Sequence, residues 1–263
     1  MSSNPTSART HVFSAMSVIA VAVAAIVAWE AIVAIFQLPK ILLPTPRQCW
    51  AAAVAQRSAL TSGAIATGSA AVVGLLSAVV FGSLLAILFS QSRRLRMALF
   101  PYVILLQTVP VVAIAPLLII WSGYTFRTVV IVTVIVCFFP IVNSVTSGLL
   151  SISPDHADLF RLYNAGRWQR LRRLQIPAAI GNLMVGVKTS AGLAVIGAIV
   201  AEFFVGNGTY YDGLGTLITK WQSLSKTDAL IAGLFASAAI GLLLFSIAHF
   251  VSEFILRRWT RNV

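Results

Sequence analysis

The stretch Ser153–Pro177, SPDHADLFRLYNAGRWQRLRRLQIP, is the longest polar interval between two strongly apolar segments of this chain. Ser153 is suited to accept a hydrogen bond from the first free backbone N–H groups of a helix, and Pro154 suits the first helical position. Asp155 complements the positive end of the helix dipole. The pattern therefore predicts a short helix that begins at Ser153. The stretch also holds five of the nineteen Lys and Arg residues, namely Arg161, Arg167, Arg170, Arg172 and Arg173.

The segment Asn164–Gly166 is predicted to end this first, partly apolar helix, because Asn and Gly tolerate the left-handed conformation that ends helices. A second, basic helix should follow, with apolar residues spaced three apart at Trp168, Leu171 and Leu174. Ile176 and Pro177 then lead back into apolar sequence. Two short helices joined by a bend, held between membrane segments, are typical of a docking element.

The composition of the whole chain excludes an ordinary soluble domain. Of its 263 residues, 59% are hydrophobic and only 10% are charged, and its mean hydropathy is +0.92, whereas a soluble domain is about 25% charged. The net charge of +12 raises the question of nucleic acid, but the basic runs flank apolar segments and no soluble basic face with interleaved aromatics exists. They fit membrane topology and anionic lipid headgroups instead. We predict an all-α polytopic membrane protein that binds no nucleic acid.

Six apolar segments are long enough to cross a bilayer. The first could also be a signal peptide, because Arg9 precedes an apolar run with small residues, but that run is longer than a signal peptide needs. Between the first two, Pro39, Pro44 and Pro46 exclude a continuous helix. The third is interrupted by prolines and is expected to be a kinked helix that lines a cavity. The segments are 12–36, 63–90, 99–121, 127–150, 181–205 and 228–256.

An even number of spans places both termini on one side of the membrane. That side would carry twelve of the Lys and Arg residues and the other side six, so the positive-inside rule makes the first side cytoplasmic. The predicted organisation is a cytoplasmic tail at 1–11, a six-helix membrane domain at 12–256 with a cytoplasmic loop at 151–177, and a basic cytoplasmic C-terminus at 257–263.

Four polar residues in or beside the spans are candidates for a solute path. Gln107 and Thr108 either bond to neighbouring helices or line the path. Asn143 breaks the apolar face of the fourth span. Glu202 lies in the fifth span, where a carboxylate is a functional candidate by default, although one near the interface is equally explained by solvation or structural pairing.

The chain lacks the usual motifs of catalysis and energy coupling. It has no phosphate-binding G-x-x-x-x-G-K-[ST], no H-E-x-x-H and no G-x-S-x-G. Cys49, Cys137 and three scattered His give no metal-binding spacing. Only Glu202 resembles part of a proton relay, which counts against a secondary transporter. The sequence thus predicts a solute path that carries no cofactor, with energy supplied by a partner. A secondary transporter or channel, and an intramembrane enzyme, remain the alternatives.

The docking stretch resembles the EAA loop of bacterial ABC importer permeases. That pattern is Glu-Ala-Ala, three residues, Gly, about nine residues, an apolar residue, Leu and Pro. Counted back from Pro177, the Glu-Ala-Ala positions fall on Asp158-Leu159-Phe160, and the Gly position falls on Asn164. The acid is shortened, both alanines are replaced by larger residues, and Asn can keep the left-handed bend. A partner's groove should therefore be wider or more apolar than usual.

Other stretches are similar to the nitrate/sulfonate/taurine branch of this family, and LFRLY resembles the relatives that import riboflavin or thiamine precursors. They are LLPTP (42–46), LQTVPVVAIAPLLIIWSG (106–123), FFPIVNS (138–144), GLAVIGAIVAEFF (192–204) and DGLGTLI (212–218).

The resemblance implies a type I ABC importer permease fold in a bacterial plasma (inner) membrane. It implies a second permease copy in a homodimer, cytoplasmic ATPase subunits that hold ATP and Mg, and an extracytoplasmic solute-binding protein that delivers a small polar organic or anionic solute. The loop then carries the coupling helix, which sits in a groove of the ATPase. Its expected anchor is Leu159, Phe160 and Tyr163, its polar rim Asp158 and Arg161, and its turn Asn164 and Gly166.

Overall fold

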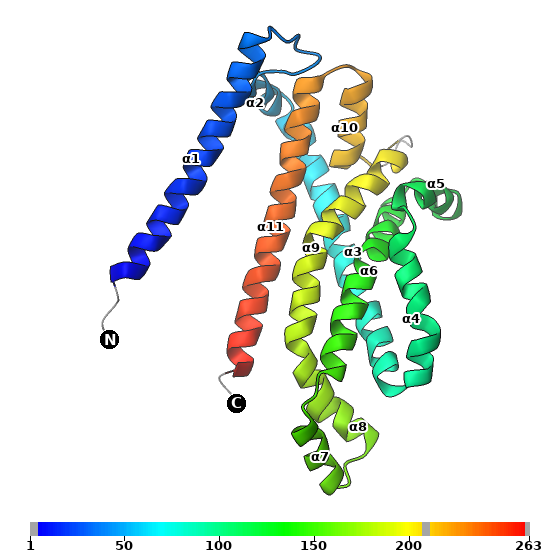
Figure 1. The fold of residues 1–263 in the computed structure, drawn as a ribbon. Helices are drawn as coiled ribbons and strands as arrows, with labels where there is room; N and C mark the ends of the chain where they lie inside the picture. The colour runs from blue at the N-terminus through cyan, green and yellow to red at the C-terminus, as the bar shows by residue number, and fades with distance from the viewer. Residues whose placement is uncertain (1–4, 207–210, 261–263) are drawn as a thin grey trace.

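The computed structural model describes residues 5–206 and 211–260, and over these residues it contains helices and no strands (Figure 1). The helices are α1 (Pro5–Ile35), α2 (Pro46–Ala55), α3 (Arg57–Gln91), α4 (Arg93–Thr108), α5 (Val111–Ser122), α6 (Phe126–Leu150), α7 (Pro154–Leu162), α8 (Arg167–Arg170), the π-helical turn η1 (Leu171–Gln175), α9 (Ile176–Val205), α10 (Leu214–Ser223) and α11 (Thr227–Thr260). Helix α1 begins at Pro5, so the helix extends into the segment expected to be a tail.

The centre of the bundle is formed by α3, α6 and α9, which pack closely because small residues line their contacts. A Cβ atom on Gly82 of α3 would lie 2.9 Å from Ile141 Cγ2 of α6. A Cβ atom on Gly148 of α6 would lie 2.7 Å from Asn182 Cβ of α9. In lipid no hydrophobic force drives helices together, so this close approach of backbones supplies much of the packing energy.

Four helical segments of the described chain are long and apolar enough to cross a membrane, or up to five if one bent pair counts as a single span. The four are Arg57–Gln91, Phe126–Leu150, Arg167–Val205 and Thr227–Arg258. The described apolar part of α1, Ile19–Ile35, is a shorter helix of the same character.

The expected single kinked helix over 99–121 was wrong. Helices α4 and α5 meet at an angle of 98°. Val109 (φ −70°, ψ 123°) and Pro110 (φ −61°, ψ 116°) between them are extended. A residue before proline is disfavoured in the helical region, so Val109 leaves the helix and the chain turns sharply. This pair has the shape of a broken span or a re-entrant loop.

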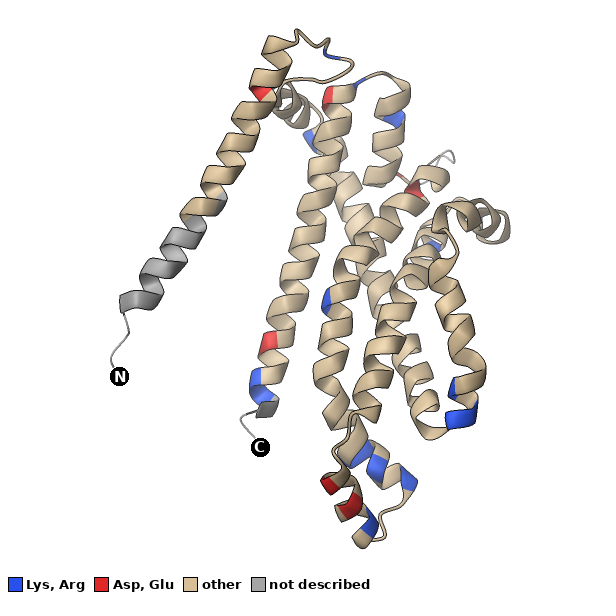
Figure 2. Ribbon diagram, in the orientation of Figure 1, with Lys and Arg blue, Asp and Glu red and all other residues tan. Residues whose placement is uncertain are grey.

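The two ends of the bundle differ in charge (Figure 2). Basic residues gather at the end formed by the α3–α4 turn, α7, α8 and the last turn of α11, and α1 also begins at this end (Figure 1). At the other end, Lys40 pairs with Asp228 at 2.9 Å and Arg47 with Glu30 at 3.4 Å. The first pair joins the segment between α1 and α2 to the start of α11, and the second joins α2 to α1.

Helix α1 stands away from the rest of the bundle along much of its length (Figure 1). It meets α11 where Trp29 stacks on Phe235, with ring centroids 6.2 Å apart. The groove beside this contact has a volume of about 730 Å³ and an almost wholly apolar lining from α1, α2, α3 and α11. Such a surface suits lipid tails or another apolar helix.

Candidate functional site: a helical arm and a buried carboxylate

Helix α7 begins as the sequence predicts. Ser153 is its N-cap, and the Ser153 Oγ accepts a hydrogen bond from the His156 backbone N–H at 3.4 Å. Pro154 occupies the first helical turn, where its missing N–H has no partner to lose. Asp155 lies in the first turn and Arg161 in the last, and both complement the helix dipole.

Helix α7 ends at Leu162, and Asn164, two residues later, has the predicted left-handed conformation with φ +51°. The Ala165 N–H donates to Phe160 O at 2.9 Å, which closes the end of the helix. Gly166 has φ −65° and is not left-handed, so Asn164 alone turns the chain. The Gly166 N–H then donates to Gln169 Oε1 at 3.1 Å and begins α8.

The second of the two predicted short helices is not a separate helix, so that prediction was wrong. Helix α8 runs through η1 into α9, so that Arg167–Val205 is one helical segment of 39 residues. Within it, the Ile176 N–H donates to Leu171 O, a step of five residues instead of four. Pro177 lacks an N–H and its ring crowds the carbonyl four residues earlier; a wider π-helical turn just before it accommodates both effects without breaking the helix.

We call α7, the turn after it and α8, residues 154–170, the arm. It projects from the basic end of the bundle (Figure 1). Its outer surface carries large apolar side chains: Leu162 and Tyr163 are each 80% exposed, Trp168 is 71% exposed and Leu159 47%. A cluster of exposed large apolar residues is typical of surfaces that bind a partner.

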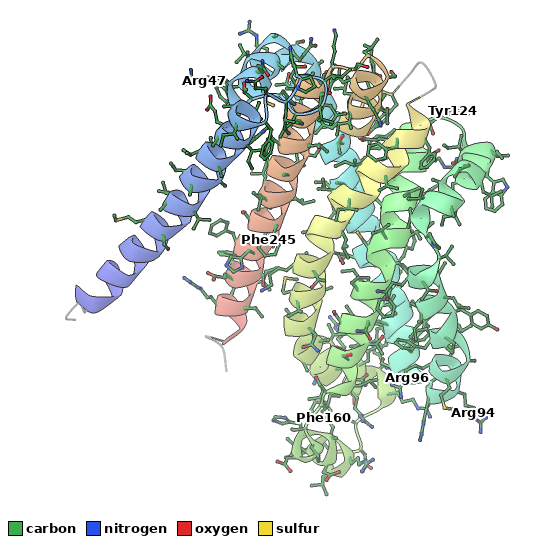
Figure 3. The ribbon with its side chains drawn as sticks, turned by 45° about the horizontal axis from the view of Figure 1, so that its top comes forward. Arg47, Arg94, Arg96, Tyr124, Phe160 and Phe245 are labelled. Atoms are coloured by element: carbon green, nitrogen blue, oxygen red, sulfur yellow. The ribbon has the colours of Figure 1, made fainter. Side chains whose placement is uncertain are left out.

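The three side chains predicted to anchor the arm in its partner differ in exposure within the chain. Leu159 and Tyr163 are exposed, but Phe160, labelled in Figure 3, is half-buried. Leu162, which the sequence analysis left out, is as exposed as Tyr163. The i, i+3 spacing from Leu159 to Leu162 places both on one face of a helix and was the available signal. The expected rim residues Asp158 and Arg161 pair with each other at 3.2 Å.

The four expected path residues do not meet at one place. Gln107 and Thr108 are exposed at the end of α4, beside the right-angle bend, and Thr108 Oγ1 donates to Leu105 O at 3.0 Å. Asn143 is also exposed and lines a cavity of about 480 Å³ between α4 and α6. Glu202 has no exposed surface. The cavity at Asn143 is lined by Arg96, Met97, Phe100, Pro101, Asn143, Thr146, Ser147 and Leu150.

Glu202 is the centre of a buried hydrogen-bond network. Its Oε2 accepts from Thr67 Oγ1 at 2.9 Å and from the Gly215 N–H at 2.8 Å, and its Oε1 accepts from the Tyr211 hydroxyl at 2.9 Å. Thr67 Oγ1 in turn accepts from the Leu214 N–H at 2.8 Å. The carboxylate thus joins α9 to α3 and lies at the N-terminus of α10, where backbone donors and the helix dipole favour negative charge.

Two features of this network were missed by the sequence analysis. A Cβ atom on Gly215 would lie 2.5 Å from Ile199 O and 2.7 Å from Glu202 Cβ, so the close approach of α10 to α9 requires glycine there. Burial, together with the Glu202 carboxylate, raises the pKa of the Tyr211 hydroxyl above its usual value, and the hydroxyl therefore remains a donor. The GLG sequence at 213–215 was the only signal, because partners 135 and 147 residues apart leave no local pattern.

Comparison with known proteins shows which family has this sequence and fold. Residues 78–261 match the family model described as binding-protein-dependent transport system inner membrane component. The chain is 34% identical over 241 residues to the riboflavin transport system permease protein RibX of Chloroflexus aurantiacus, covering 89% of this chain and 86% of that one. It is 32% identical over 174 residues to the formylaminopyrimidine transport permease protein ThiX of Halalkalibacterium halodurans, covering 66% and 68%.

A solved structure has the same fold. The chain superposes on a chain of the structure titled "Crystal structure of an amino acid ABC transporter with histidines" with a TM-score of 0.60 and 17% identity. The match covers 78% of this chain and 96% of that one. The family model spans well over half of the sequence. The chain therefore belongs to the family of inner membrane components of binding-protein-dependent transport systems.

Proposed function

We propose that this chain is the permease subunit of an ATP-driven ABC importer. It forms the membrane path, while separate cytoplasmic ATPase subunits bind ATP and Mg and hydrolyse the ATP. A solute-binding protein delivers the solute on the other side, and a second copy of the chain completes the path. The observation that carries this proposal is the arm, a contact surface of exposed apolar side chains in a chain that has no nucleotide-binding motif of its own.

In this proposal the chain crosses a bacterial inner membrane six times. The spans are α1, α3, the α4–α5 pair, α6, the segment Arg167–Val205 and α11. The arm and both termini are cytoplasmic, as the concentration of Arg at that end supports (Figure 2). The segment between α1 and α2, together with α10, then faces the solute-binding protein.

The arm acts as a lever in this mechanism. ATP-driven closure of the ATPase subunits displaces α7, whose residues Asp158–Arg161 and Tyr163 lie in the ATPase groove and whose turn at Asn164–Gly166 fixes its direction. Because α8 continues through η1 into α9 without a break, the displacement is carried along a rigid helix into the membrane. Such rigid-body movement of one element against others is a usual route between inward-open and outward-open states.

In this proposal, exposed polar side chains on otherwise apolar helices line the solute path. We assign Gln107, Thr108 and Asn143 to its lining, on the basis of their exposure on α4 and α6. We assign Glu202 to its mouth, where it holds α10 in place. The solute is a small polar organic or anionic compound. Relatives named for riboflavin, formylaminopyrimidine and aliphatic sulfonates support that class without choosing within it.

The decisive experiment is purification of a tagged chain after coexpression with candidate ATPase subunits from the same organism, followed by reconstitution into proteoliposomes. We expect an ATPase subunit to copurify with the chain. In proteoliposomes in which the orientation of the complex is known, solute uptake should require ATP on the side that carries the ATPase subunits. The alternative is a secondary transporter or channel. Uptake driven by an ion gradient or by the solute gradient alone, with no ATPase bound, would establish that alternative and reject the proposal.

A further inference from the structure

A small polar pocket lies at the base of the arm, apart from the exposed apolar face of α7. It has a volume of about 190 Å³. Its lining comes from the last turn of α3, from α8 and from η1, so it lies where the arm joins the bundle. The lining residues are Ser90, Gln91, Arg167, Arg170 and Gln175.

The wall of the pocket is held in place by hydrogen bonds. Gln91 Nε2 donates to Gln175 Oε1 at 2.9 Å, and Gln175 is only 9% exposed. Gln91 Nε2 also lies 3.0 Å from Ser90 Oγ. A hydrogen bond therefore joins the end of α3 to η1. The side-chain amides of Gln91 and Gln175 hold each other in place without a ligand.

Arg170 is the unsatisfied group of this pocket. Its Nε is buried and has no hydrogen-bond partner in the part of the chain that the structure describes. A buried donor without a partner is costly, and native structures rarely leave one unexplained. An oxygen anion in the pocket would accept from this Nε.

No carboxylate of the described chain neutralises the pocket. Asp158 pairs with Arg161 at 3.2 Å and Glu253 pairs with Arg257 at 3.0 Å, whereas Arg167 and Arg170 form no ion pair with any described residue. Further arginines that form no ion pair with any described residue lie at the same end of the bundle, on the first turn of α4 and on η1, and Figure 3 labels two of them. They are Arg93, Arg94, Arg96, Arg172 and Arg173.

The position of the pocket favours a membrane lipid as the source of the anion. Gln91 is the last residue of α3, one of the four helices that are apolar and long enough to cross the membrane. The pocket thus lies where a candidate span ends, a position that suits the headgroup region of a membrane. Clusters of Lys and Arg immediately outside a span attract anionic lipids, and basic pockets between spanning helices hold their headgroups.

We propose that this pocket binds a tetrahedral oxyanion, supplied by the phosphate of an anionic membrane phospholipid. A guanidinium presents parallel N–H donors that match two oxygens of a phosphate, so Arg170 and Arg167 form the cationic side of the site. The bound phosphate links α8 to the end of α3. Its effect on the arm rests on the proposed function, in which a fixed arm base would transmit movement of α7 to α9.

Lipid binding to the purified chain without any ATPase subunit tests the site separately from the coupling mechanism. The probes are dioleoyl phosphatidylglycerol, dioleoyl phosphatidylcholine and inorganic phosphate, and bound lipid is counted by native mass spectrometry. The variants are Arg170→Gln and Arg170→Lys, with Arg173→Gln as a control that removes the same charge from an exposed residue three positions away.

We expect the wild type to bind phosphatidylglycerol about tenfold more tightly than phosphatidylcholine, the step expected from one charge-assisted pair. Arg170→Gln should remove this preference, and Arg173→Gln should keep it within about twofold. Arg170→Lys keeps the charge but not the Nε donor and should lose part of the preference for phosphatidylglycerol. This variant tests the site if Arg170→Gln does not fold.

Several results would overturn the proposal. Equal losses in Arg170→Gln and Arg173→Gln would show a diffuse basic surface and no built site. Binding of inorganic phosphate, lost in Arg170→Gln, without any lipid preference would keep the oxyanion site and reject its lipid source. Unchanged lipid and phosphate binding in Arg170→Gln, with weaker ATPase association in the coexpressed complex, would assign the pocket to a carboxylate of the partner instead.

Discussion

The Tyr211 hydroxyl donates a hydrogen bond to Glu202 Oε1 at 2.9 Å, in a site where Glu202 has no exposed surface. The other carboxylate oxygen accepts from Thr67 and from the Gly215 N–H. The side chain therefore uses both oxygens to hold three separate segments, namely α3, the residues before α10, and α10 itself. These hydrogen bonds attach the start of α10 to α9 at the end of the bundle opposite the arm.

Glu202→Ala should destabilise the protein by about 3 kcal/mol, because it leaves three buried donors without an acceptor and creates a cavity. Glu202→Gln should cost less, because its amide oxygen can still accept from Thr67 and Gly215 while its NH₂ donates to the Tyr211 oxygen. Thermal unfolding in detergent measures both. Equal melting temperatures for Glu202→Ala and the wild type would contradict the positioning role.

Gly215→Ala should displace α10 from α9, because its Cβ atom would lie 2.5 Å from Ile199 O. We expect a loss of about 2 kcal/mol in stability, in the range of overpacked core variants, and faster proteolysis near α10. The matched control is Gly241→Ala in α11, where an added Cβ atom meets nothing within 4 Å. If the control loses as much as Gly215→Ala, the effect is not due to the close approach.

Asn164→Gly should be tolerated, whereas Asn164→Val should strain the turn of the arm. Asn164 has φ +51°, and a left-handed conformation costs an ordinary L-residue about 1–2 kcal/mol. The rate of ATP hydrolysis per solute imported by the reconstituted complex measures the coupling. We expect this ratio to rise in Asn164→Val and to stay near the wild-type value in Asn164→Gly; similar ratios in both variants would exclude the turn as the cause.

Leu162→Asp and Tyr163→Asp should release the ATPase subunit without unfolding the chain, because both side chains are 80% exposed and bury little within the chain itself. Phe160→Asp is a different test, since Phe160 is half-buried and its replacement should also lower the melting temperature. Coprecipitation with the ATPase, alongside thermal unfolding, separates the two effects. An ATPase that stays bound to Leu162→Asp and Tyr163→Asp would remove the arm from the interface.

Single cysteines at opposite ends of the bundle test the orientation. Ser223→Cys lies at the end of α10 and Ser151→Cys lies just before the arm, and both positions are exposed. The native Cys49 and Cys137 are buried and should give little background. An impermeant thiol reagent added to intact cells should label Ser223→Cys and not Ser151→Cys. The reverse pattern would invert the topology.

The start and the turn of the arm were predictable from sequence because they depend on local interactions. The Ser153 cap, the proline in the first turn and the left-handed Asn164 involve contacts over a few residues, so residue types at fixed spacing determine them. The apolar segments were predictable for the same reason, since hydropathy is a property of each segment alone. The family resemblance followed from the same stretches.

Several features depended on the tertiary structure. The sequence placed three prolines between 99 and 121 without showing which of them breaks the helix; the 98° bend is at Val109–Pro110, while Pro101 and Pro116 remain inside helices. The continuity of α8 with α9 was hidden by Pro177, because a π-helical turn is a local rearrangement whose energy depends on packing.

The sequence by itself determined that this chain is a helical membrane protein, where its apolar segments lie, and how its polar loop is capped and bent. Each of these rests on solvation or on hydrogen bonds between near neighbours in the chain. Only the tertiary structure decided what surrounds Glu202 and Arg170. Glu202 meets Thr67 across 135 residues, and Arg170 shares a pocket with Ser90 and Gln91. Packing alone brings groups so far apart in the chain together. Burial then makes the paired carboxylate of Glu202 and the unpaired Nε donor of Arg170 energetically important.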